Sequence, residues 1–211
     1  MTLVPVLPLS LPSDLAGQSN GKLGSCQLAV VHFPGLGDAN LHHLVARGYN
    51  AFNMAFHGEA STGRFGSVNS LTTTGGGAYR SLALQEGEFF KRYSPTYNPL
   101  ATKLTNQRVY LGKRYFLRFG FSACAAPGTS PHGWGCAIDL ALFSPVTHAV
   151  SSLAGNAAAY EWAKVNAPSF GFGWEAHEGS PEFESWHVDW TYGDAVPRSV
   201  LDLEAWLAAV A

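Results

Sequence analysis

The apolar positions along the chain follow two periods, which predict alternating helices and strands. Residues 38–56 carry Leu41, Leu44, Val45 and Phe52 at helical spacing, with Asp38 as the expected N-cap. The continuous apolar run at 136–143 is instead typical of a buried strand. On the same grounds we expect helices at 81–93, 152–166 and 197–210, and strands at 28–33, 67–73, 109–119, 170–174 and 184–191. This order predicts an α+β fold, a mainly antiparallel sheet with flanking helices.

The remaining segments are polar or rich in Gly and Pro and read as loops. Residues 1–27 are expected to be loosely structured, 58–66 to be a loop, and 94–107 to be a long surface loop. Within 109–119, we expect the chain to turn at Gly112 and Lys113 if this segment is a hairpin. At 211 residues the chain is large enough for one sizeable domain with its own core.

Overall charge and cysteine content narrow the class of protein. Charged residues make up 13% of the chain and the net charge is −2, which predicts neither a nucleic acid nor an anionic membrane as partner. The three cysteines, Cys26, Cys124 and Cys136, form no CxxC pair, and we expect them to be free, buried thiols. No apolar run approaches the roughly 18 residues needed to span a bilayer.

Two short segments, at 130–139 and 184–187, together hold the parts of a catalytic zinc site. They supply two imidazoles and a carboxylate in His132, Asp139 and His187, and a further carboxylate in Glu184. A hydrolytic Zn²⁺ takes three protein ligands of these types and keeps a fourth position for water. A carboxylate beside that water can act as general base. We therefore predict one Zn²⁺ per chain on the first three residues, with Glu184 as the base in amide hydrolysis.

Several neighbouring residues offer alternatives. Glu182 competes with Glu184 as the base, although its spacing from His187 is less favourable. Cys136 lies inside the first segment, but on a strand its parity relative to Asp139 points it to the opposite face, against a role as fourth ligand. We expect the other six histidines to be surface or structural residues.

The two segments match the pattern SxHxxGxAxD followed by ExWH, and this resembles the signature of the VanY-type zinc D-alanyl-D-alanine carboxypeptidases and the related peptidoglycan endopeptidases of phage lysins. The hedgehog signalling domain shares that fold. The likeness extends to the segment at 78–85, similar to the family's YRS…Q, and to Pro-Gly-Thr-Ser at 127–130. Residues 169–172 also resemble the stretch that precedes ExWH in the family. The resemblance covers roughly residues 70 to 192.

The resemblance implies a substrate and further site residues. Arg80 would contact the carboxylate of the substrate and assist catalysis, and Gln85, Ser130 and Trp186 would belong to the substrate-binding site. The implied substrate is a bacterial peptidoglycan peptide, cut in its stem or bridge by a phage endolysin endopeptidase. A D-Ala-D-Ala carboxypeptidase is the alternative within this class. A non-catalytic zinc module that binds the cell wall or acts in signalling is the alternative from another class, although the presence of Glu184 argues against it.

The sequence also supports expectations about the location of the protein and its division into domains. The first dozen residues are apolar but lack a cationic region and are interrupted by prolines, so no signal peptide is predicted. A phage lysin would act from the host cytoplasm on the cell wall, and any other relative would be extracellular or in the wall. We expect a monomer in which an N-terminal segment, 1–66, packs on a catalytic domain, 67–211, within one globular unit.

Overall fold

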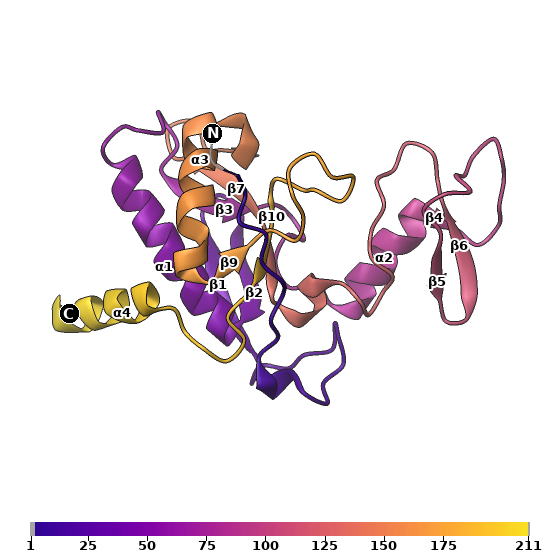
Figure 1. Ribbon diagram of the computed structural model, residues 1–211, viewed down its shortest axis with the longest axis horizontal. Coiled ribbons are helices and arrows are strands. Elements are labelled where there is room, and N and C mark those ends of the chain that lie inside the picture. The colour runs from indigo at the N-terminus through magenta and orange to yellow at the C-terminus, as the bar shows by residue number, and fades with distance from the viewer. Residues whose placement is uncertain (1–2, 211) are drawn as a thin grey trace.

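A five-stranded antiparallel sheet forms the centre of the protein. The computed structural model describes residues 3–210 and places β7 (Ala137–Ser144) in the middle of this sheet. β7 pairs with β3, β8 and β10, and β10 also pairs with β9 (Figure 1). The bounds of these partners are Ser70–Thr73 for β3, Ala149–Ser152 for β8, Phe172–Gly173 for β9 and His187–Trp190 for β10. β7 occupies the middle because its apolar residues are buried on both faces.

Two smaller antiparallel sheets lie outside the central one. A hairpin joins β1 (Leu28–Phe33) to β2 (Gly37–His42). The third sheet has the order β4-β6-β5, with β4 at Tyr93–Ser94, β5 at Arg108–Tyr110 and β6 at Lys113–Leu117. β5 and β6 form the hairpin expected at 109–119, and it turns at Leu111 and Gly112, both with positive φ.

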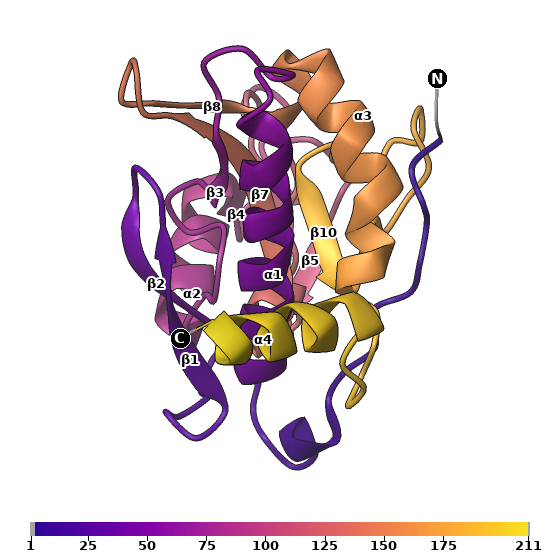
Figure 2. The ribbon, with the colours of Figure 1, turned by 90° about the vertical axis from the view of Figure 1, so that its left-hand side faces the viewer.

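Three helices cover one side of the central sheet. α1 (His43–Ala60), α3 (Ala157–Asn166) and α4 (Arg198–Val210) lie on the same side of β3, β7 and β10 (Figure 2). The main core fills the space between these layers, where Phe52 of α1 stacks against Trp162, Phe170 and Phe172. Short 3-10 turns complete the fold at Ser13–Leu15 (η1), Pro131–Trp134 (η2), Leu153–Gly155 (η3) and Ala167–Phe170 (η4). None of the helices in residues 3–210 is both long and apolar enough to cross a membrane.

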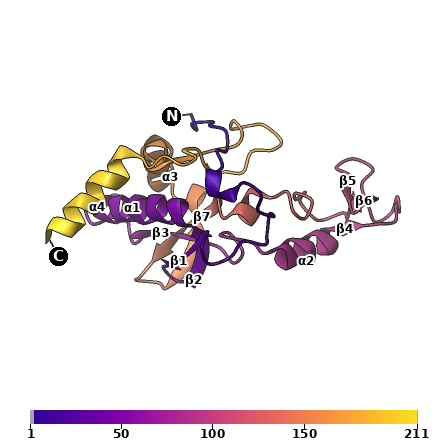
Figure 3. The same cartoon turned by 90° about the horizontal axis from the view of Figure 1, so that it is seen from below.

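The segment 82–124 forms a separate lobe beside this body. It contains α2 (Leu82–Arg92) and the sheet of β4, β5 and β6, and it has a small core of its own around Phe89, Tyr93, Tyr115 and Leu117. The lobe projects from the body at the end opposite α4 (Figures 1 and 3).

The structure confirms the predicted α+β class and corrects several boundaries. The helix expected at 38–56 begins only at His43, because residues 37–42 pair with β1, and the cap is the His42 side chain rather than Asp38. The helix expected at 152–166 begins at Ala157, after η3 and a cap by Asn156. β8 was not predicted, since all four of its residues are exposed and show no apolar alternation. The predicted division of the chain into an N-terminal segment, 1–66, and a catalytic domain, 67–211, stays a prediction.

Candidate metal centre

Strand pairing and a tight turn bring the three candidate ligands together. β10 lies against β7 in a register that opposes His187 and Asp139, so these side chains are cross-strand neighbours. His132 reaches them from η2, the turn just before β7. Gly135 ends this turn with a φ of +65°, and a Cβ there would lie 2.6 Å from the backbone nitrogen of His42. Glycine therefore lets the chain fold His132 back over the start of β7.

The donor atoms of these residues stand at nearly equal distances. Nε2 of His132 lies 3.2 Å from Nδ1 of His187 and 3.3 Å from Oδ1 of Asp139, and the last two atoms are 3.1 Å apart. In a tetrahedral site with bonds of 2.0–2.1 Å, donor atoms lie about 3.3 Å from one another. The three atoms thus form one face of a tetrahedron of the size that a small divalent cation requires, and the donor set fits such an ion.

Each imidazole is held by a second contact behind the donor atoms. Nδ1 of His132 lies 3.0 Å from the carbonyl oxygen of Ala78, which fixes this nitrogen as the protonated one. Nε2 of His187 lies 3.2 Å from Oδ1 of Asp189, which stands two residues further along β10 and has an almost fully buried side chain. Both contacts orient the other ring nitrogen of each histidine toward Oδ1 of Asp139, where the three donor atoms meet.

Asp189 was not among the residues predicted from the sequence. It stands two positions after His187, and residues i and i+2 of a strand project to the same face. This period-two relation to a candidate ligand was the signal that could have identified it. Glu175, which lies close to His187 and Asp189, comes from a different loop and carried no such signal.

We expect Asp189→Asn to weaken metal binding by about 10- to 100-fold, as is typical when a carboxylate that contacts a metal-binding histidine is changed. The amide keeps the shape of the side chain but loses the charge that orients His187. Chelator competition would measure the change. Asp202→Asn, on the exposed face of α4, is the matched control and should bind as the unchanged protein does. Equal affinity in both variants would remove Asp189 from the site.

The electrostatics of the cluster favour a cation. Burial alone would raise the pKa of Asp139, but its hydrogen bonds with His132 and His187 outweigh this and lower it, so the carboxylate stays ionised. Burial lowers the pKa of His132. For His187, the carboxylates of Asp139 and Asp189 outweigh burial and raise the pKa to about 10. A proton on His187 would compete with a metal ion for the same nitrogen, so metal binding is expected to release protons and to weaken on acidification.

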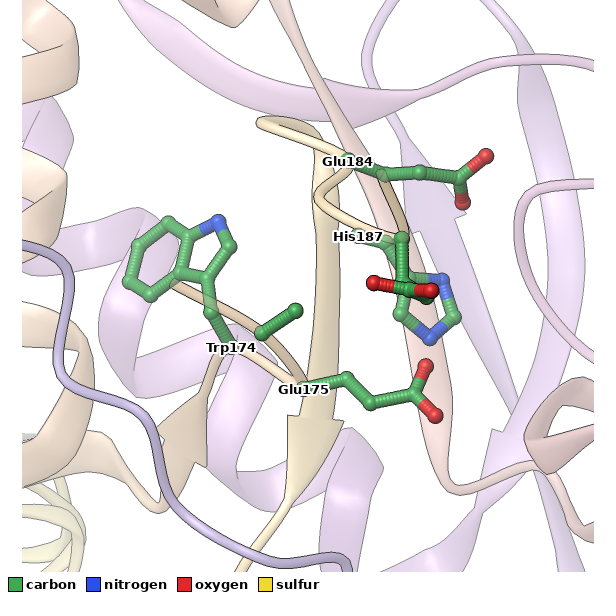
Figure 4. A pocket seen from close by; sticks show the side chains of 6 residues that line it. Trp174, Glu175, Glu184 and His187 are labelled. Atoms are coloured by element: carbon green, nitrogen blue, oxygen red, sulfur yellow. The ribbon is translucent and has the colours of Figure 1, made fainter. Parts of the chain in front are cut away.

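Glu184 lies beside this cluster in a small pocket. Figure 4 shows its carboxylate projecting on the same side of the chain as the His187 ring. Partial loss of surrounding water raises the pKa of Glu184, although His187 opposes the shift. A carboxylate in this position can exchange protons with a group bound next to His187. Glu182 lines the same pocket, so both candidate bases remain, and the other lining residues are Trp174, Glu175 and Ala176.

Arg80 also lies at the cluster. Its Nη2 atom is 2.6 Å from Oδ2 of Asp139, and its Nε atom donates to the carbonyl oxygen of Gly76. Because Arg80 binds Oδ2, the other carboxylate oxygen of Asp139, Oδ1, faces His132 and His187. Nη1 of Arg80 has no partner among residues 3–210, and the side chain is about one-quarter exposed. Arg80 is therefore within reach of an anionic group that enters beside the cluster.

The three predicted substrate contacts occupy different positions. Gln85 is buried and joins internal groups: its amide donates to Asn20 and to the carbonyl of Arg80, and its oxygen accepts from the backbone of Gly128. These bonds tie α2 to the loop that precedes η2. Ser130 is also buried, and among the described residues its hydroxyl has no hydrogen-bond partner. Trp186 is 43% exposed next to His187 and is accessible to a ligand.

The remaining candidate ligands lie elsewhere. Cys136 is buried in the main core, with its sulfur directed at the carbonyl of Trp134, and is not in the cluster. The three cysteines are free as predicted, but Cys26 is exposed rather than buried, because it lies in the turn before β1. His42 and His43 group with Asp14, yet both nitrogens of His42 already bond to Asp14 and to the amide of Leu44.

Comparisons with known proteins place this site in a family. No curated protein matches the chain. The solved structure of VanYB in complex with D-alanine-D-alanine is similar at 14% identity and a TM-score of 0.45, over 95% of this chain and 96% of that one. The family model of the VanY D-alanyl-D-alanine carboxypeptidases matches residues 69–194, from β3 to just beyond β10, and includes the whole cluster. Because this match spans more than half of the chain, the protein belongs to the VanY family of peptidases.

Proposed function

We propose that this protein is a zinc-dependent peptidase that removes the terminal D-alanine from peptidoglycan peptides ending in D-Ala-D-Ala. Membership of the VanY family supports the reaction class. The observation that carries the metal is the set of three donor atoms 3.1–3.3 Å apart, contributed by His132, Asp139 and His187. Two imidazoles and one carboxylate are a ligand set that zinc peptidases use, and they leave a fourth position for water.

The roles of the other residues follow from their positions. When bound, Zn²⁺ supplies the Lewis acidity that activates water and polarises the scissile carbonyl. Glu184 takes the proton of the attacking water and passes it to the nitrogen of the departing D-alanine. Arg80 pairs with the carboxylate at the end of the substrate and so fixes which bond lies over the ligands. Exposed Trp186 covers the peptide beside His187.

Product analysis tests the proposed function. The purified protein, with its metal content measured, is incubated with a stem peptide that ends in D-Ala-D-Ala and with the same peptide amidated at its end. We expect free D-alanine from the first peptide and little from the second, loss of activity with a chelator and recovery with Zn²⁺. Cleavage within isolated peptidoglycan, without preference for a free end, would instead support the endopeptidase. The phage-lysin role and its route to the wall stay predictions.

Arg80→Lys should lower turnover of the free-ended peptide by about tenfold or more, which corresponds to the 1.5–3 kcal/mol of a charged hydrogen bond. Lysine keeps the charge but cannot form the two parallel hydrogen bonds that a guanidinium makes with a carboxylate. Turnover of the amidated peptide should change much less. Because Arg80 also contacts Asp139, the zinc content of the variant must be measured alongside. An equal loss with both peptides would show that Arg80 supports the ligand rather than the substrate.

A further inference from the structure

Charge is unevenly distributed between the lobe and the rest of the molecule. The lobe, residues 82–124, has only two acidic side chains, Glu86 and Glu88, and holds seven of the 13 basic ones: Lys91, Arg92, Lys103, Arg108, Lys113, Arg114 and Arg118. Its formal charge is therefore +5, and the rest of the chain carries −7, which together give the −2 of the whole. The low net charge conceals a strongly basic lobe.

Most of these cations are not neutralised by a neighbour. Glu88 pairs with Arg92 at 3.0 Å and with Lys91 at 4.0 Å, and Glu86 accepts a hydrogen bond from Tyr110. No carboxylate within residues 3–210 pairs with the other five basic side chains of the lobe: Lys103, Arg108, Lys113, Arg114 and Arg118. Three of these, Lys113, Arg114 and Arg118, are exposed.

The sheet of the lobe has one packed face and one open face. Tyr115 and Leu117 of β6 point inward and pack with Phe89 of α2. Alternation along the strand turns Arg114 and Phe116 to the opposite face. There Arg114 lies across from Val109, which is 65% exposed. The outer face thus combines the exposed side chains of Arg114 and Val109 with Phe116, which is partly covered by Tyr97.

Exposed apolar side chains stand next to the cations in the turns that flank this face. Leu111 at the tip of the hairpin is 80% exposed and lies two residues before Lys113. Leu104 follows Lys103 and Phe119 follows Arg118, and they are 60% and 50% exposed. Backbone bonds between residues 101–103 and 117–119 hold these two pairs together. Leu100, in the same turn, is 90% exposed.

This combination points to one kind of partner. Lys and Arg attract any polyanion, but a nucleic acid or a phosphodiester polymer would leave the exposed leucines in water. An anionic lipid surface accommodates both, since its phosphates bind the cations while apolar side chains enter the boundary between headgroups and acyl chains. We propose that the lobe docks on an anionic membrane surface through the outer face of its sheet and the turns at 98–104 and 110–113.

Vesicle sedimentation tests the proposal with the full-length protein. Vesicles of phosphatidylcholine alone are compared with vesicles of phosphatidylcholine and phosphatidylglycerol in equal parts. We expect binding to be tighter to the anionic vesicles by roughly tenfold or more and to fall as salt increases. Equal binding to both, or no binding to either, would overturn the proposal.

Two sets of variants locate the contact. Lys113→Glu, Arg114→Glu and Arg118→Glu combined should reduce binding by roughly tenfold or more. Lys22→Glu, Arg64→Glu and Arg198→Glu combined change the net charge equally but lie on the body, and this control should lose far less. Equal losses would show that only net charge matters.

The apolar contribution distinguishes a membrane from other polyanions. Leu100→Ser with Leu111→Ser should weaken vesicle binding while leaving the charge unchanged. Binding that is insensitive to these changes, or that is equally tight to DNA or to polyphosphate, would identify a general polyanion site and refute the lipid surface. Unfolding temperature and turnover of the soluble peptide should be unchanged in the lobe variants, which separates loss of docking from loss of folding or of the proposed activity. The body control loses the exposed ion pairs of Arg64 with Glu59 and of Arg198 with Asp202, so a small drop in its unfolding temperature is expected, with turnover unchanged.

Discussion

Replacing His132 by alanine should remove bound metal and hydrolysis together. Two donors would remain, Nδ1 of His187 and Oδ1 of Asp139, and these are too few to hold a zinc ion in a catalytic site. We expect about one zinc per chain in the unchanged protein, close to none in His132→Ala, and peptidase activity at the background level. Metal analysis of the purified proteins, with activity assays before and after addition of Zn²⁺, measures both quantities.

A second histidine provides the control for this experiment. His177→Ala removes an exposed imidazole from the loop between β9 and β10, outside the cluster, and should leave zinc and activity intact. Because His132 also bonds to Ala78, thermal unfolding of His132→Ala shows whether the fold survives. Full zinc content in a folded His132→Ala protein would refute the ligand assignment.

Glu184→Gln should keep the metal while losing most of the activity. The amide has nearly the shape of the carboxylate but cannot accept a proton, and general-base catalysis contributes about 10²- to 10⁴-fold. Loss of surrounding water raises the pKa of Glu184 in the metal-free protein, and a cation bound beside it would oppose this shift. Comparing the acidic limb of the pH profile between the unchanged protein and the variant shows whether Glu184 titrates in the active enzyme.

Glu182→Gln is the matched control, since Glu182 lines the same pocket. Its turnover should stay within a few-fold of the unchanged protein. If Glu182→Gln loses activity and Glu184→Gln does not, the two roles must be exchanged.

The three candidate ligands could be identified from the sequence because each lies in a short motif. Gly133 and Gly135 indicate a tight turn, and the apolar run that follows them predicts the strand that carries Asp139. The pairing of that strand with β10, which sets His187 opposite Asp139, was not predicted and is seen only in the structure. Short motifs therefore identified the three candidate ligands.

Other features depended on contacts between distant segments. Arg80 and Asp139 are 59 residues apart, and no local pattern indicates that their side chains meet. The start of α1 depended on competition, since residues 37–42 have helical periodicity but gain more from pairing with β1. The net charge of the whole chain averages over the basic segment 82–124, whose charge can be counted from the sequence but whose separation into a lobe with its own core only the fold shows. The expectation that no membrane is a partner stays a prediction, and the vesicle experiment tests it.

The uneven charge of the lobe also makes the molecule an electric dipole. Far from a negatively charged surface, the net charge of −2 gives weak repulsion. Salt screens charges beyond a Debye length, about 8 Å at physiological ionic strength. A charged surface therefore interacts mainly with the charges of the protein region nearest to it. An approach with the lobe in front is then attractive, and one with α4 in front is not. Orientation would be selected before contact, so that encounters proceed with the lobe leading.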